Sequence, residues 1–224
     1  MFQIVAIMGN KGAGKDTVAN ILKDVKSDQY DQIYIMSFAD SLKSAVAAIF
    51  GWDKEMLDGK TIKSRKWREI EIPELSRAIG TTVTPRILLQ QIGTDILRKH
   101  LYDNIWVDSL ITKMKNISDA NPDSSILFLI TDCRFKNEIM TLKLNNARFI
   151  HVERFNTDPG FVENAYIFNN TKNPIKKFIT YQKLKKYHRS EWDWIGVVKY
   201  PIMIYNVSTM KDLKQEVVKL TKEI

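Results

Sequence analysis

The sequence predicts an α/β protein with a mostly parallel, five-stranded sheet covered by helices. Three observations lead to this fold class: five short apolar runs, amphipathic helical patterns in the intervals between them, and a glycine-rich turn directly after the first run. Strands that alternate with helices favour a parallel sheet, because each parallel neighbour needs a crossover connection. Ligands of such sheets bind at the carboxyl ends of the strands. We therefore expect the functional side chains to follow the strands.

The five predicted strands are short runs in which apolar residues dominate. They cover residues 2–8, 33–38, 125–131, 147–153 and 200–205. Runs of this length with few polar positions are typical of strands that are buried on both faces. The carboxyl ends of these strands share one edge of the sheet, which we expect to carry Asp16, Asp40, Asp132 and the loop after Tyr205.

The predicted helices carry apolar residues at helical spacing. The first starts at Lys15, and one of its faces presents Val18, Ile21, Leu22 and Val25. A second is expected to start at a capping Asp40 and to stop at Gly51. Further helices are expected to start at Pro85, Asp103, Arg134 and Ser208.

The composition is that of an ordinary soluble protein, with 224 residues of which 44% are hydrophobic and 27% charged. We expect a single domain over residues 1–224, with an insertion at 52–84 and a lid at 155–191. The one cysteine, Cys133, has no partner for an internal disulfide, and the sequence shows neither a signal peptide nor a membrane-spanning run. This predicts a cytoplasmic protein, located in the host cytoplasm if a phage encodes it.

The net charge of +8 and the pI near 9.4 allow two interpretations, a surface for nucleic acid or a pocket that collects several phosphates. The densest basic stretch, residues 170–191, interleaves lysines with aromatic residues. A solvated helix face and a lid over a nucleotide are the two leading interpretations of this stretch, and a nucleic-acid patch is the third.

Residues 9–17, GNKGAGKDT, nearly match the phosphate-binding pattern GxxxxGK[ST], with Asp16 at the hydroxyl position and Thr17 behind it. Glycines allow backbone N–H groups to surround a phosphate, and Lys15 reaches the β and γ oxygens of a nucleotide. The motif lies between a predicted strand and a predicted helix, which is the context it requires. The sequence therefore predicts a P-loop NTPase fold. Because a carboxylate beside a triphosphate would repel it, we expect Asp16 and Thr17 to hold Mg²⁺.

Asp132 and Arg134 follow the apolar strand at 125–131. Phosphoryl-transfer proteins keep a carboxylate for magnesium at such a place, and a guanidinium is suited to bidentate phosphate contact. A helix cap is the alternative for Asp132, and an ion pair with Glu138 is the alternative for Arg134.

The central block from Pro85 contains Gly93 within a helical pattern. A glycine in such a place usually marks a close approach or a break. Trp106 follows in the next helix, where a core position is the leading interpretation and a base-stacking surface the second.

Six segments, in this order and at comparable spacing, resemble the bacteriophage deoxynucleoside monophosphate kinases: GNKGAGKDT, ADSLKSA, RILLQQIGTD, NIWV, DCRFKNE and HRSE. Those enzymes are members of the P-loop nucleoside monophosphate kinase fold, and in them an aspartate after the loop lysine is the usual form. The resemblance touches nearly the whole chain, but it is dense only at the loop and between Arg86 and Arg154. Residues 52–84 show no resemblance.

The resemblance implies that separate sets of residues bind the two substrates. ATP would be held by Gly12, Gly14, Lys15, Asp16 and Thr17. The acceptor nucleotide would be surrounded by Lys11, Leu42, Lys43, Arg65, Arg86, Gly93, Thr94, Trp106, Asp132, Arg134, Glu138 and Ser190. Arg68 is an equally good candidate for the place of Arg65. The catalytic residues would be Lys15, Arg86 and Arg134.

The reaction that the resemblance implies is transfer of the γ-phosphoryl group of ATP to a deoxynucleoside 5′-monophosphate, which gives a deoxynucleoside diphosphate and ADP, with Mg²⁺ as cofactor. Two alternatives stay open. One is a P-loop kinase of another small phosphorylated acceptor, of the dephospho-coenzyme A or phosphomevalonate type, and the other is a nucleic-acid-stimulated ATPase. The expected partners are small molecules and a second copy of the chain in a homodimer, without nucleic acid or membrane.

Overall fold

The computed structural model describes residues 2–154, 158–206 and 209–220. The chain divides into two compact units: Met1–Ser37 with Lys113–Ile224, called here the sheet unit, and Phe38–Thr112, called the helical unit. The predicted insertion at 52–84 falls within the helical unit. The predicted lid at 155–191 falls within the sheet unit, and its residues 155–157 lie outside the described residues.

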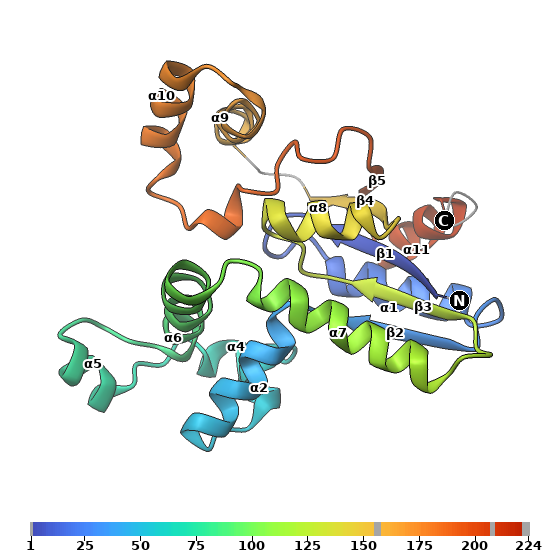
Figure 1. Cartoon of the computed structure of the whole chain (residues 1–224), viewed down its shortest axis with the longest axis horizontal. Coiled ribbons are helices and arrows are strands. Elements are labelled where there is room, and N and C mark those ends of the chain that lie inside the picture. Colours follow the sequence, from blue (N-terminus) through green and yellow to red (C-terminus); the bar gives the residue numbers. More distant parts are fainter. Residues whose placement is uncertain (1, 155–157, 207–208, 221–224) are drawn as a thin grey trace. The chain divides into compact units, whose positions relative to one another are not determined.

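The sheet unit contains five parallel strands in the order β2-β3-β1-β4-β5 (Figure 1). Their bounds are β1 Phe2–Met8, β2 Gln32–Met36, β3 Ile126–Ile130, β4 Arg148–Glu153 and β5 Ile202–Tyr205. The predicted parallel sheet is therefore confirmed, with strand ends that differ from the predicted ones by two residues at most. With a glycine-rich loop between β1 and the first helix, this is the predicted P-loop fold.

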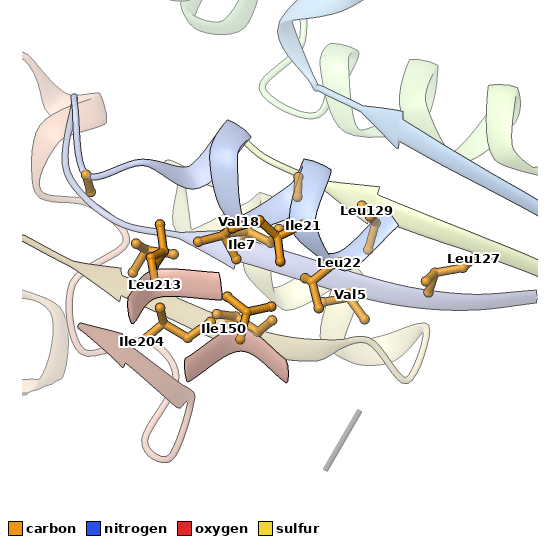
Figure 2. Close-up of a cluster of buried hydrophobic side chains, with 14 residues drawn as sticks. Val5, Ile7, Val18, Ile21, Leu22, Leu127, Leu129, Ile150, Ile204 and Leu213 are labelled. Atoms are coloured by element: carbon orange, nitrogen blue, oxygen red, sulfur yellow. The ribbon is translucent and has the colours of Figure 1, made fainter. Parts of the chain in front are cut away.

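Helices α1 (Lys15–Lys26) and α11 (Met210–Leu220) pack on one face of this sheet. Figure 2 shows Val18 and Leu22 of α1 in the same cluster as Val5 and Ile7 of β1 and Leu213 of α11. On the other face of β1, alternate residues 4, 6 and 8 are also buried. Because β1 is covered on both sides, its apolar run has no polar alternation. The start predicted at Ser208 lies outside the described residues.

The sheet unit also contains the helices that follow β3 and β4. Helix α8 (Lys136–Leu144) connects β3 to β4, and it buries Ile139 and Leu142. Helices α9 (Pro159–Asn170) and α10 (Pro174–Leu184) pack against each other as a helical hairpin. A short 3₁₀ turn, η2 (Arg189–Glu191), precedes β5. Among the described helices, none has the length and apolar character needed to span a membrane.

The helical unit is built from short helices. They are α2 (Ala39–Phe50), α3 (Lys54–Asp58), α4 (Ile62–Trp67), α5 (Pro73–Ile79), α6 (Pro85–Gln90) and the π-helix η1 (Gln91–Leu101), and the unit also contains the start of α7 (Ile105–Ala120). Asp40 lies in the first turn of α2, and the N-cap is Phe38, so the predicted cap at Asp40 was wrong. The helix stops at Gly51 as predicted, and this glycine adopts the left-handed conformation.

Candidate active site

The loop after β1 has a backbone that depends on glycine. Gly9, Gly12 and Gly14 adopt φ angles of 146°, 80° and 100°. Residues other than glycine rarely adopt such positive φ angles. At Gly9 the space is also closed, because a Cβ would lie less than 3.0 Å from the carbonyl oxygen of Val152 in β4. The loop therefore lies directly against the carboxyl end of β4.

Gly9→Ala is expected to lower the free energy of unfolding by about 3 kcal/mol, because it combines a strained φ angle with a backbone clash. In a chain of this size that corresponds to a fall in Tm of about 10 °C. Gly12→Ala is the matched control, since Gly12 also has a positive φ but nothing lies within 4 Å of its Cβ position. Thermal unfolding of both variants should show the larger loss for Gly9→Ala. Equal losses would contradict the proposed clash with β4.

Lys15 is buried within this loop, with 8% of its surface exposed. Its ammonium group donates hydrogen bonds to the carbonyl oxygens of Gly9 at 2.9 Å and Asn10 at 2.8 Å. Burial, followed by the positive charge of Arg134, lowers the pKa of Lys15 to about 8 from its ordinary value of 10.5. The carboxylates of Asp16, Asp132 and Glu191 act in the opposite direction. Lys15 therefore lies in a cluster of opposed charges.

Two residues that follow strands hold the loop from outside. The side-chain amide of Asn206, which follows β5, donates to the carbonyl of Ala13 at 2.8 Å. Arg154, which follows β4, donates to the carbonyl of Gly12 at 3.3 Å. Sequence reasoning did not name either residue. Their only signal was their position directly after a predicted strand, which is where ligand-binding loops of parallel sheets lie.

The start of α8 fixes the backbone around Arg134. The carboxylate of Glu138 is buried and accepts the backbone N–H of Arg134 at 2.8 Å and that of Phe135 at 3.1 Å. A carboxylate at this position satisfies N–H groups that have no partner within the helix. The N-cap of α8 is Phe135, so Asp132 does not occupy the cap position that was its alternative role.

The guanidinium of Arg134 faces Glu191 in η2, with Nη1 and Oε1 3.6 Å apart. The sequence had suggested Glu138 as the alternative partner. Ser190, which was predicted to bind the acceptor, is buried, and its hydroxyl lies 2.8 Å from Nδ1 of His188.

Asp193 ties the segment around η2 to α8. Its buried carboxylate accepts the backbone N–H of Lys136 at 2.9 Å and pairs with Arg189 through two contacts of 3.2 Å. The guanidinium of Arg189 also lies over the ring of Phe135, 5.6 Å from its centroid. The segment carrying Glu191 is therefore anchored to the same helix start that positions Arg134.

In the helical unit, cationic side chains gather around the turn after α3. Lys43 lies 3.1 Å from Asp58, and both side chains are largely buried. Arg65 donates to the carbonyls of Gly59 and Lys60, each at 3.1 Å. Arg68, the alternative to Arg65, donates to the carbonyl of Asp58 at 3.5 Å. The structure thus brings Lys43 and both candidate arginines to one turn.

Arg86 lies next to this part of the helical unit. Its Nε is hydrogen-bonded to Glu69, and its backbone N–H donates to the carbonyl of Arg68 at 3.1 Å. The side chain of Arg86 is 23% exposed and that of Glu69 is 54% exposed, so the pair is partly open to solvent. An exposed pair of this kind is weak and can be exchanged for another anion.

Gly93 marks a close approach, as its place in the helical pattern predicted. It lies in the π-helix η1, and a Cβ there would meet the side chain of Leu42. Its carbonyl accepts the indole N–H of Trp106 at 2.9 Å. Trp106 is 7% exposed, which favours the core interpretation of this residue. π-Helical turns are frequent at functional sites, and Thr94 lies in the same one.

The predicted site residues therefore form two groups. The sheet unit contains Lys11, Gly12, Gly14, Lys15, Asp16, Thr17, Asp132, Arg134, Glu138 and Ser190. The helical unit contains Leu42, Lys43, Arg65, Arg86, Gly93, Thr94 and Trp106. In the part of the chain that the structure describes, there is no group of three or more His, Cys, Asp or Glu side chains suited to hold a metal ion.

The family model and two viral relatives that match this chain carry the same description. Residues 57–167 match the family model for deoxynucleotide monophosphate kinase. A deoxynucleotide monophosphate kinase from Acanthamoeba polyphaga mimivirus is 26% identical over 222 residues, which cover 96% of this chain and 94% of that protein. A deoxynucleoside-5′-monophosphate kinase from Escherichia phage T5 is 26% identical over 192 residues, covering 65% of this chain and 74% of that protein.

Among solved structures, a dephospho-CoA kinase from Campylobacter jejuni matches 100% of this chain and 97% of its own, at 15% identity and a TM-score of 0.43. The family model and the two viral relatives cover both the loop and the central block between them. This chain is therefore similar in sequence to the deoxynucleotide monophosphate kinases, which confirms the predicted resemblance. The match also includes residues 57–84, where no resemblance was predicted.

Proposed function

We propose that the protein transfers the γ-phosphoryl group of ATP to a deoxynucleoside 5′-monophosphate and releases ADP and the deoxynucleoside diphosphate. The observation that carries this proposal is the charge cluster at the carboxyl ends of the neighbouring strands β1 and β3. Lys15 of the glycine loop lies there within the field of Arg134, Asp132 and Asp16. Phosphoryl transfer needs few covalent steps from the protein, and its catalysis consists mainly of positioning and charge neutralisation.

Within this proposal, the sheet unit binds ATP. The backbone N–H groups of Gly12 and Gly14 face the phosphates, and Lys15 exchanges its bonds to the loop carbonyls for bonds to the β and γ oxygens. Arg134 contacts the γ-phosphoryl group during its transfer. Its guanidinium is partly exposed, and its backbone is held in place by the carboxylate of Glu138. Asp132 and Lys11 complete this group of residues.

The helical unit binds the acceptor phosphate in this proposal. Lys43, Arg65 and Arg86 are the cations, and their present partners are the carboxylates of Asp58 and Glu69 and the carbonyls of the turn after α3. The acceptor phosphate would replace these partners, and it is negatively charged like the carboxylates of Asp58 and Glu69. The cluster of Leu42, Gly93 and Trp106 supports the helix that carries Thr94.

Mg²⁺ would be held by Asp16 and Thr17. Asp16 is exposed in the first turn of α1, directly after Lys15, and Thr17 is partly buried beside it, so a carboxylate and a hydroxyl are present where the ATP phosphates would lie. When bound, the metal neutralises negative charge on the transferring phosphates.

Asp16→Ala is expected to lower turnover and to raise the Mg²⁺ concentration needed for half-maximal activity, because one oxygen ligand is lost. Asp24→Ala is the matched control, since Asp24 is an exposed aspartate of the same helix. The measurement is a magnesium titration of initial rates at saturating nucleotide. An unchanged magnesium requirement in Asp16→Ala would contradict the assignment.

A coupled assay of ADP release with each of the four deoxynucleoside monophosphates tests the function. We expect release that depends on at least one of them, while the corresponding ribonucleotides measure the selectivity for deoxyribose. Release with dephospho-coenzyme A or phosphomevalonate alone would contradict the proposal and favour the other acceptor class. ATP turnover that rises on addition of DNA, with binding that falls steeply with salt, would favour the nucleic-acid-stimulated ATPase.

A further inference from the structure

Glu191 lies beside two groups to which the proposed function gives a role. Its carboxylate faces the guanidinium of Arg134 at 3.6 Å, and its charge acts on Lys15 together with those of Asp16 and Asp132. A carboxylate beside the cations of a phosphate site opposes the binding of a polyanion, so its presence requires an explanation.

The backbone of Glu191 is held in place by several bonds. Its N–H donates to the carbonyl of His188 at 2.9 Å, and its carbonyl accepts the indole N–H of Trp194 at 3.1 Å. The contacts of Asp193 with Arg189 and with the N–H of Lys136 join this segment to the start of α8. The carboxylate of Glu191 is therefore presented to Arg134 from a fixed frame.

The pair between Glu191 and Arg134 is itself weak. The two side chains are 32% and 35% exposed, and their closest charged atoms are 3.6 Å apart, which is longer than a charge-assisted hydrogen bond. Pairs with this degree of exposure contribute little to stability. The backbones on both sides of this pair are held in place, but the pair itself is weak. The guanidinium of Arg134 can therefore exchange the carboxylate of Glu191 for another anion.

We propose that Glu191 is a positioning residue that holds Arg134 beside the phosphate-binding loop in the nucleotide-free protein and releases it to the γ-phosphoryl group of ATP. This inference rests on the proposed function, because it assigns Arg134 to the group in transfer. In the nucleotide-free protein, Glu191 offers Arg134 a single negative charge. The γ-phosphate carries more charge and more acceptor oxygens, so it displaces the carboxylate.

The experiment is a double-mutant cycle of Glu191→Gln and Arg134→Gln, measured by calorimetric titration. The ligands are ADP and the ATP analogue with a β,γ-imido bridge, which carries the γ-phosphoryl group but does not transfer it. Glu191→Gln keeps the backbone contacts and the size of the side chain and removes the charge. Glu163→Gln is the matched control, because Glu163 is an exposed glutamate of α9 in the same unit.

We expect Glu191→Gln to tighten binding of the imido analogue by about two- to fivefold, which is the range of one exposed ion pair. Binding of ADP should change less, since ADP has no γ-phosphoryl group. In the Arg134→Gln background the same substitution should have little effect, because the cation that Glu191 holds is absent. The KM for ATP should fall in Glu191→Gln while kcat does not rise.

Three results would overturn the proposal: weaker or unchanged binding of the imido analogue, equal tightening of the analogue and ADP, or the same effect with and without Arg134. Glu191→Asp keeps the charge and should stay close to the wild-type affinity, and thermal unfolding identifies any variant that is merely less stable. The titrations need no acceptor. They therefore test Glu191 separately from deoxynucleotide kinase activity, which the assay of ADP release tests.

Discussion

Arg134→Gln is expected to lower kcat about 10³-fold with a deoxynucleoside monophosphate as acceptor, while the protein stays folded and still binds ATP. An arginine that contacts the transferring phosphoryl group stabilises charge that appears only in the transition state, and contributions of this size are typical of such residues. The only charged partner described for its guanidinium is Glu191, in a partly exposed pair. Loss of that pair has little effect on the free energy of unfolding.

Arg86→Gln is expected to change the kinetic constants in a different way from Arg134→Gln. Arg86 belongs to the helical unit and is proposed to anchor the acceptor phosphate, so its loss should raise the KM for the acceptor at least as much as it lowers kcat. Arg77→Gln is the control, because Arg77 is an exposed arginine of α5. The measurements are kcat, both KM values and Tm for all three variants. Wild-type rates in a folded Arg134→Gln protein would remove this arginine from the mechanism.

Lys15→Ala is expected to lower kcat/KM for ATP by roughly 10²- to 10³-fold, because the loop would lose the buried ammonium group that is proposed to contact the ATP phosphates. The wild-type protein should also show a characteristic pH dependence. The pKa of Lys15 is lowered to about 8 in the nucleotide-free protein, so the affinity for ATP should fall as the pH rises through about 8. Titrations of ATP affinity between neutral and alkaline pH measure this effect.

The contribution of Lys15 to the free energy of unfolding should rise with pH, whereas the affinity for ATP should fall. The unfolded chain has a Lys15 pKa near 10.5 and therefore binds more protons than the folded chain between about 8 and 10.5. This group then adds to the free energy of unfolding as the pH rises through that window. Lys15→Arg keeps its charge throughout and should lose both effects. A wild-type ATP affinity that is constant up to pH 10 would contradict a lowered pKa.

The sheet could be predicted because each strand leaves a pattern within its own short stretch of sequence. Strands β1 and β3 are nearly continuous apolar runs, because strands that are buried on both faces have few polar positions. The first strand was predicted at its observed bounds, Phe2–Met8. The helix from Lys15 was equally clear, since its buried residues Val18, Ile21 and Leu22 share one face. The glycine loop between them follows from the same local pattern.

The helical unit was harder to predict because its elements are short. Helices α3 and α4 have five and six residues, too few to show a helical period. Their starts depend on side-chain caps, such as Asp53, whose carboxylate accepts the N–H of Glu55. The turn after α3 is stabilised by Arg65 in α4 and by Arg68 at the end of α4. No pattern in the sequence predicts such contacts.

The residues of the candidate site could be selected from the sequence, but their contacts could not. Lys15, Asp132 and Arg134 were chosen by residue type and by position after a strand, and the structure places them in one electrostatic cluster. Their partners come from distant parts of the chain and were not predicted. Asn206 holds the loop at Ala13 from 193 positions away, and Glu191 faces Arg134 from the far side of the α9–α10 hairpin in the sequence.

The bond between Asp193 and the backbone of Lys136 makes one amide proton a reporter of motion. The first N–H groups of a helix have no acceptor within it, so the amide of Lys136 is protected only while a carboxylate from 57 positions further along the chain remains in place. Its hydrogen-exchange rate therefore measures how often the segment with Glu191 separates from α8. Exchange at this single amide, followed with and without ATP, measures the separation of this segment from α8 without a substitution.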